Sequence, residues 1–167
     1  MTPIRTLLLA ALLSGVSGLT FAHTEKSSAV KAESADREQS EWGRPGDSRR
    51  LTRTISVQML DSMRFVPDRV VVKQGETVKF VVRNDGKAAH EMVIGSRKAI
   101  DEHAALMIKY PGMEHDDPDS VRVAPGEVGN IVWDFNRAGE FHFACLIPGH
   151  FQAGMAGKIG VIAAQGK

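Results

Sequence analysis

Short runs of alternating hydrophobic and polar residues fill most of the chain beyond residue 50. These runs are rich in β-branched residues, and turn-forming Gly, Pro, Asn and Asp separate them at nearly regular spacing. Such a pattern predicts β-strands joined by tight turns, and therefore an all-β sandwich or barrel. The expected strands are 52–60, 69–73, 77–83, 90–94, 121–124, 129–135, 140–144 and 157–162.

Two stretches depart from the simple strand pattern. Residues 65–68, Phe-Val-Pro-Asp, are expected to form a connection that follows an edge strand at 52–60. Residues 96–108 have helical periodicity, with Ser96 as the N-cap and Tyr110-Pro111 as the stop signal. The residues expected on one face of this helix are Ile100, Ala104, Met107 and Ile108. The prediction is thus an all-β domain with one helical insertion.

The first 22 residues have the composition of an export signal. Arg5 gives a positive start, an apolar run follows at 7–16, and Thr20-Phe-Ala22 is a small-x-small cleavage motif. The apolar run is too short to span a bilayer comfortably, so we expect no stable membrane insertion. Cleavage after Ala22 would release a soluble protein into the periplasm, and an uncleaved signal that acts as a tether is the alternative.

Residues 23–50 are mostly polar and charged, with Trp42 as their one aromatic residue. They bury too little apolar surface to offset the entropy of ordering, so we expect a disordered linker before a domain at 51–167. The formal net charge is +1 with both signs mixed. This argues against nucleic-acid binding, which requires a basic face.

Cys145 is the only cysteine, which excludes an internal disulfide and a cysteine-based zinc cluster. His150 and Met155 follow it, each after four intervening residues, on a loop that contains Pro and Gly. A thiolate and a thioether beside an imidazole suit copper, which must be held as both Cu(I) and Cu(II). His90 follows an apolar run and is placed to supply a second imidazole. Taken singly, each residue could be a buried cysteine, a surface histidine or a core methionine, but the ordered set favours copper.

These motifs resemble those of the cupredoxins, the small domains that hold type 1 copper. The similarity runs from about Thr52 to Ala163 and nearly fills the predicted domain. It rests on Phe65-Val-Pro67, the segment 72–78 (Val-Lys-Gln-Gly-Glu-Thr-Val), Asn84, His90 and the loop 145–155. The resemblance implies a Greek-key β-sandwich or barrel with one copper ion. In it His90, Cys145 and His150 are the trigonal ligands and Met155 is the weak axial ligand.

A further segment narrows the resemblance. Residues 110–118, Tyr-Pro-Gly-Met-Glu-His-Asp-Asp-Pro, and the nearby His90-Glu-Met92 are similar to the periplasmic cupredoxins associated with bacterial copper tolerance. This implies a copper-handling protein with one-electron redox capability. A dedicated soluble electron carrier to a periplasmic oxidoreductase or oxidase is the alternative, because one site can serve both roles. Copper oxidases and nitrite reductases need His-x-His pairs and further domains, so we expect no enzyme.

Strand alternation predicts which side chains face the metal. Phe141, Phe143 and Cys145 share a face that must be interior, so His142 is expected at the surface. By the same rule, Glu91 points away from the face that its two neighbours share.

The position of Glu91 is also a departure from the blue-copper relatives, which usually carry Asn or Ser there to brace the ligand loops. The hydrogen bonding around the site, and with it the spectrum and potential, is therefore open. A greener, more tetragonal site is one expectation.

Two further expectations concern binding. By the resemblance, His150 lies near the surface among Pro148, Gly149, Phe151 and Ala153, an apolar patch on which a redox partner could dock, and we expect a monomer. A weaker second copper site is possible at Met113 and His115, because methionine and histidine suit Cu(I). His103, Met107 and Met92 are possible helpers of that site. The alternative is an acidic solvated loop after the helix, with Met107 in the core.

Overall fold

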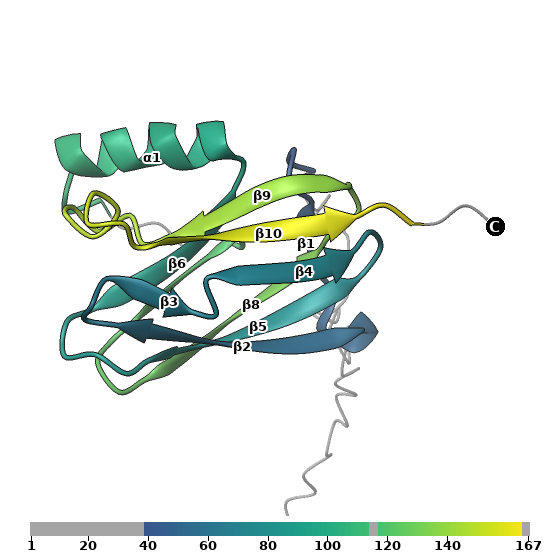
Figure 1. Ribbon diagram of the computed structural model, residues 1–167, viewed down its shortest axis with the longest axis horizontal. Coiled ribbons are helices and arrows are strands. Elements are labelled where there is room, and N and C mark those ends of the chain that lie inside the picture. The colour runs from purple at the N-terminus through teal and green to yellow at the C-terminus, as the bar shows by residue number, and fades with distance from the viewer. Residues whose placement is uncertain (1–38, 114–116, 165–167) are drawn as a thin grey trace, which may run out of the picture. The chain divides into compact units, whose positions relative to one another are not determined.

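The computed structural model describes residues 39–113 and 117–164, which form two β-sheets packed face to face with one helix outside them (Figure 1). One sheet has the strand order β1-β8-β5-β2-β3, and the other has the order β4-β10-β9-β6-β7. All of these residues belong to one compact unit, Asp36–Lys167. The strands are β1 Arg44–Pro45, β2 Arg53–Leu60, β3 Arg64–Val66, β4 Arg69–Lys73, β5 Thr77–Asn84, β6 His90–Gly95, β7 Ser120–Val123, β8 Val128–Asp134, β9 Gly139–Ala144 and β10 Ala156–Ile162.

The predicted all-β sandwich with one helical insertion is confirmed. The strand pairs β2–β5 and β4–β10 are parallel, and the other pairs are antiparallel. Along β2, Ile55, Val57 and Met59 are buried while their neighbours are exposed or half-buried. This is the period-2 pattern from which the strand was predicted.

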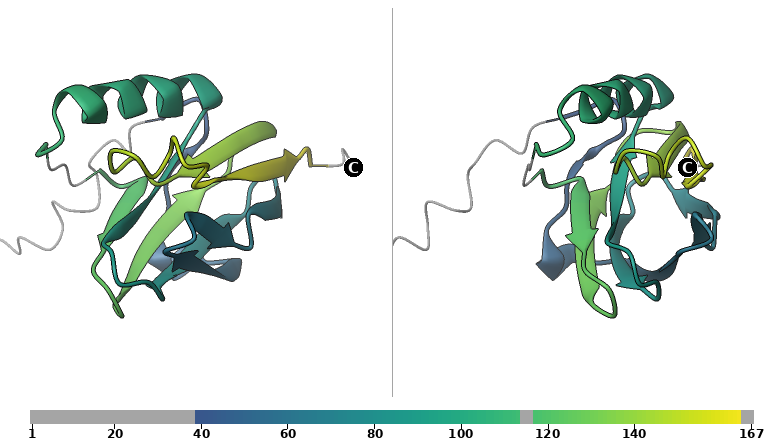
Figure 2. Two further views of the ribbon diagram at one scale, coloured as in Figure 1. Left: turned by 60° about the vertical axis from the view of Figure 1, so that its left-hand side comes forward. Right: turned by 90° about the vertical axis from the view of Figure 1, so that its left-hand side faces the viewer.

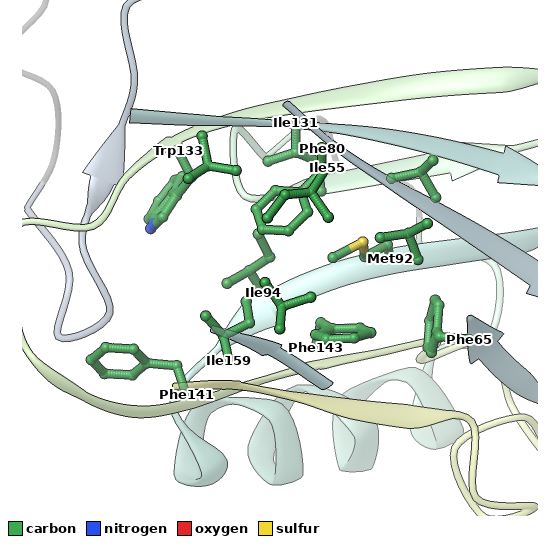
Figure 3. Close-up of a cluster of buried hydrophobic side chains, with 14 of the residues drawn as sticks. Ile55, Phe65, Phe80, Met92, Ile94, Ile131, Trp133, Phe141, Phe143 and Ile159 are labelled. Carbon is green, nitrogen blue, oxygen red and sulfur yellow. The ribbon is translucent and has the colours of Figure 1, made fainter. Parts of the chain in front are cut away.

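The main core lies between the two sheets and is built largely from aromatic and β-branched side chains (Figure 3). Phe65 and Phe143 meet edge to face, with ring centroids 5.0 Å apart and an interplanar angle of 78°. Phe80 and Phe135 pack in the same manner at 6.1 Å. The Phe65–Phe143 contact joins β3 of one sheet to β9 of the other, so it helps fix how the two sheets are stacked near Cys145.

Helix α1, Arg97–Lys109, covers the outer face of β6 and β9 (Figures 1 and 2). Ser96 caps it as predicted, because its hydroxyl accepts a hydrogen bond from the Ala99 N–H at 3.2 Å. The buried face contains Ile100, Ala104 and Met107, but Ile108 is 58% exposed and its expected place on that face is wrong. The apolar stripe is narrower than the sequence indicated. No helix within the described residues is long and apolar enough to cross a membrane.

The predicted edge position of the strand at 52–60 is wrong for its last three residues. The short strand β3 pairs antiparallel with the end of β2, from Gln58↔Val66 to Leu60↔Arg64, and therefore flanks it. The segment predicted as a plain connection thus begins inside a strand. Three residues, of which only Phe65 is buried, are too few to give a recognisable alternation.

The predicted linker at 23–50 is wrong for residues 39–50, which pack on the sandwich. Strand β1 pairs with β8, and the Trp133 indole N–H donates to the Trp42 carbonyl at 2.9 Å. The Trp42 indole donates in turn to Asp119 Oδ2 at 3.2 Å. A short 3₁₀ helix, η1 Ser48–Arg50, follows. The composition of residues 39–50 did not predict that they are ordered. Their order depends on one aromatic side chain and on backbone pairing at an open edge of the sheet. The predicted signal and residues 23–38 lie outside the described residues.

Candidate metal centre

Three of the predicted donor side chains meet at one end of the sandwich. His90 is the first residue of β6, Cys145 directly follows β9, and His150 lies on the loop between β9 and β10. Because β6 and β9 are antiparallel, the start of one and the end of the other lie together. One nitrogen of each imidazole and Cys145 Sγ lie within 4.8 Å of one another.

The distances suit a shared metal ion. His90 Nδ1 is 3.2 Å from His150 Nδ1, and Cys145 Sγ is 3.3 Å from His150 Nδ1. A first-row metal ion bonded at about 2.0–2.3 Å to three donors in one plane separates them by about 3.5–4 Å. Small movements of the side chains would therefore accommodate the ion. Two imidazoles and a thiolate are the donor set of a type 1 copper site.

Strand alternation places Cys145 as predicted. Phe141, Phe143 and Cys145 all belong to the core between the sheets, and Phe143 and Cys145 are fully buried. His142 points to the other face and is kept out of the donor cluster. Its side chain is only 15% exposed, however, because helix α1 covers that face, so its expected surface position is wrong. Burial lowers the pKa of His142.

The loop after Cys145 is closed by its own backbone hydrogen bonds. The His150 N–H donates to the Ile147 carbonyl, the Met155 N–H to the His150 carbonyl, and the Cys145 N–H to the Met155 carbonyl, at 3.0–3.1 Å. Gly149 and Gly154 have φ values of 93° and 91°, a region that disfavours other residues. Met155 is consequently carried back beneath Cys145 and is fully buried in the core.

Glu91 braces the loop instead of weakening it. Its carboxylate is buried and accepts a hydrogen bond from the Leu146 N–H at 2.9 Å, and its own N–H donates to Cys145 Sγ at 3.4 Å. Glu91 therefore ties β6 to both Cys145 and the residue after it. The longer side chain performs the bracing that the sequence left open at this position.

Burial sets the protonation of the donors in the metal-free protein. It raises the pKa of the Cys145 thiol to about 12, and it lowers the pKa of His150, to which the nearby His90 adds a smaller effect. Near neutral pH the cysteine is therefore a thiol, while the His150 imidazole is neutral. A metal that takes the thiolate must displace one proton.

Asp61 is a neighbour of the site that the sequence did not reveal. It lies in the turn after β2, and its Oδ1 is 3.2 Å from His90 Nε2. The N–H groups of Lys87 and Ala88 donate to the same carboxylate at 2.7 and 3.2 Å and lower its pKa, Lys87 most strongly. An aspartate in a turn, 29 residues before the histidine, carries no local signal of this contact.

The residues suggested for a second site are not brought together where they are described. Met92 is in the core between the sheets, whereas Met107 is in the smaller core beneath helix α1. Met113 is 39% exposed. His115 lies outside the described residues, so the second site remains a prediction that Met92 and Met107 do not support.

The fold and the donor cluster together define a class of protein. Residues 52–162 match the family described as copper binding proteins of the plastocyanin/azurin family. The chain belongs to this family, the cupredoxins.

Within the family, the chain is similar to proteins named copper-resistant cuproprotein CopI. The protein of that name from Rubrivivax gelatinosus is 52% identical over 118 residues, which cover 71% of this chain and 72% of the relative. The one from Pseudomonas aeruginosa is 35% identical, with 72% of this chain and 82% of the relative covered. The identities show that the chain is a cupredoxin close to CopI.

Solved structures agree on the fold. Reduced auracyanin from Roseiflexus castenholzii superposes with a TM-score of 0.58 at 20% identity, covering 66% of this chain and 98% of that protein. Auracyanin A, the "blue" copper protein of Chloroflexus aurantiacus, gives 0.55 at 20% identity, with 65% and 97% covered. At these identities the likeness supports the sandwich alone.

Proposed function

We propose that the protein is a periplasmic copper-tolerance cupredoxin that holds one copper ion at His90, Cys145, His150 and Met155. The observation that carries this proposal is the meeting of two imidazoles and the only cysteine within 4.8 Å at one end of the sandwich. The similarity to copper-resistant cuproproteins supports the tolerance role. The bound ion supplies one-electron exchange between Cu(II) and Cu(I).

Each residue has a distinct role in this proposal. Cys145 would give up its proton and bind copper through its thiolate, while His90 and His150 would each bind it through a ring nitrogen. Met155, which is fully buried, would add its thioether sulfur as a weaker donor. The loop hydrogen bonds and the Glu91 brace hold the donors before metal arrives, so little rearrangement accompanies a change of charge.

His150 is the point at which the site reaches the surface. It is half-buried, and its neighbours Pro148, Gly149 and Ala153 are exposed around the half-buried Phe151. This exposed apolar loop supports docking of a partner protein that delivers, receives or oxidises the metal. Docking of a partner protein at His150 requires only one copy of this chain, so the proposal needs no dimer.

Dedicated electron transfer is the second candidate, and the position of the half-buried His150 at the surface favours it. A deletion strain separates the two roles. Copper-sensitive growth with normal respiration supports tolerance, whereas loss of an electron-transfer chain without copper sensitivity supports the carrier. The family consists of copper-binding proteins, and an activity of an enzyme is not part of the proposal.

Export to the periplasm is supported by the signal-like residues 1–22. The direct test is the N-terminal sequence of protein recovered from the periplasmic fraction, which we expect to begin at His23. Recovery of the intact chain with the membrane fraction would instead indicate the uncleaved tether.

The metal assignment is tested by Cys145→Ser. The oxidised wild type should be coloured through charge transfer from the Cys145 thiolate to copper, and the variant should lose the intense visible band. His90→Ala and His150→Ala should weaken or open the site while leaving the thiolate available. A Cys145→Ser protein that keeps the band would overturn the assignment.

A further inference from the structure

Asp61 contacts the His90 imidazole on the side that faces away from the donor cluster. The Nδ1 atom of the His90 ring faces His150 at 3.2 Å, and its Nε2 atom faces Asp61 Oδ1 at 3.2 Å. The His90 side chain has no solvent exposure, whereas the Asp61 side chain is 43% exposed. The Asp61 carboxylate therefore connects the buried His90 imidazole to the protein surface.

The contact decides which ring nitrogen can bind a metal. An ionised carboxylate can only accept hydrogen bonds, so the nitrogen that faces Asp61 must carry the proton. In a neutral imidazole the other nitrogen then keeps its lone pair, and here that nitrogen is Nδ1, which points at the cluster. Asp61 thus selects the tautomer of His90 that the site needs.

The surrounding loop holds the carboxylate in this position. The Lys87 N–H donates to Oδ2, and the Ala88 N–H donates to Oδ1, so the turn after β2 is tied to the loop that leads into β6. The side chain of Asn84 shapes the same loop by donating to the carbonyls of Ala88 and Val123 at 2.8 and 2.9 Å. Gly86 is packed so closely on Asp61 that a Cβ there would overlap the carboxyl group.

We infer that Asp61 is a positioning residue that sets the tautomer of His90 and, through its negative charge, biases the site toward Cu(II). The inference rests on the proposed function, because it takes His90 as a copper ligand. A carboxylate that accepts from the outer nitrogen of a histidine orients the ring and makes it a stronger donor. Its charge stabilises the higher oxidation state more than the lower one.

Asp61→Asn removes the charge and is the main test. Loss of such an outer partner typically weakens metal binding by about 10–100-fold. We expect Cu(II) affinity to fall by at least about tenfold more than Cu(I) affinity, which raises the one-electron potential by at least about 59 mV. The visible band should persist but shift. Potentiometry and competition titrations of the copper-loaded protein measure these changes.

Asp85→Asn is the matched control. Asp85 lies in the neighbouring loop that leads into β6, and it contacts Gln58 and Arg83 instead of a predicted ligand. The Asp85→Asn substitution removes the same charge at a similar place, and we expect it to raise the potential markedly less than Asp61→Asn does. A shift in Asp61→Asn no larger than in Asp85→Asn would overturn the inference, because the effect would then be one of net charge.

Two measurements decide the question even if Asp61→Asn does not fold. Gly86→Ala keeps the carboxylate but should push it from His90, and we expect a potential change of the same sign. Long-range ¹H–¹⁵N NMR of the metal-free wild type should show His90 protonated at Nε2. Protonation at Nδ1 would refute the inference. This spectrum tests the Asp61 contact alone, whereas a wild type without copper binding or colour would refute the proposed function.

Discussion

Replacing Glu91 tests whether the buried brace holds the loop that carries Cys145. Glu91→Ala leaves the Leu146 N–H without its acceptor, and Leu146 is only 2% exposed, so water cannot easily replace it. An unpartnered buried donor costs about 1–3 kcal/mol. The lost methylene adds about 0.8 kcal/mol, for a total of about 2–4 kcal/mol. Glu91→Gln keeps an accepting oxygen and should cost about 1 kcal/mol, the difference between a charged and a neutral hydrogen bond.

The assay is urea unfolding of the metal-free protein at neutral pH, with the slope checked against wild type. Glu102→Ala is the control, because Glu102 is exposed on helix α1 in a 3.8 Å ion pair with Lys98 and should change stability by less than about 0.5 kcal/mol. If Glu91→Ala changes the free energy of unfolding by no more than the control does, the hydrogen bond between Glu91 and Leu146 does not stabilise the protein. If Glu91→Gln costs as much as Glu91→Ala, the accepting oxygen is not the cause.

Three other predictions concern the metal. Met155→Gln should lower the potential and Met155→Leu should raise it while both stay coloured, and voltammetry that finds no change would make Met155 a packing residue only. If the second site exists, the wild type binds more than one Cu(I), and Met113→Leu with His115→Ala removes the extra equivalent without altering the visible band; a wild-type stoichiometry of one ends this hypothesis. Because the Cys145 thiol has a pKa of about 12 and must lose its proton to bind, the apparent copper affinity should rise about tenfold per pH unit between pH 7 and 8. Chelator competition at both pH values measures this slope, and an affinity independent of pH contradicts it.

The features predictable from the sequence are those with a local pattern. The strands follow from period-2 alternation, and the end of α1 near Tyr110 follows from the proline after it. The spacing of Cys145, His150 and Met155 is local as well, because one loop carries all three. Alternation also placed Phe143 and Cys145 on the inner face, which their burial confirms.

The features that the sequence did not reveal depend on contacts between distant segments. The pairing of β3 with β2 and the docking of Trp42 need a partner that no window of sequence contains. The same holds for Asp61, which reaches His90 only after the turn and the loop have met. His142 shows the converse error, since alternation gave its face correctly but could not show that a helix covers that face.

The burial of Cys145 also protects the metal-free protein from oxidation. A thiol with a pKa of about 12 has only about one thiolate in 10⁵ molecules at pH 7, and the thiolate is the form that attacks disulfides and oxidants. With no solvent exposure, the sulfur is also closed to large reagents. In an oxidising compartment, the metal-free protein would therefore keep its lone cysteine as a thiol, without forming disulfide-linked dimers, until copper displaces the proton.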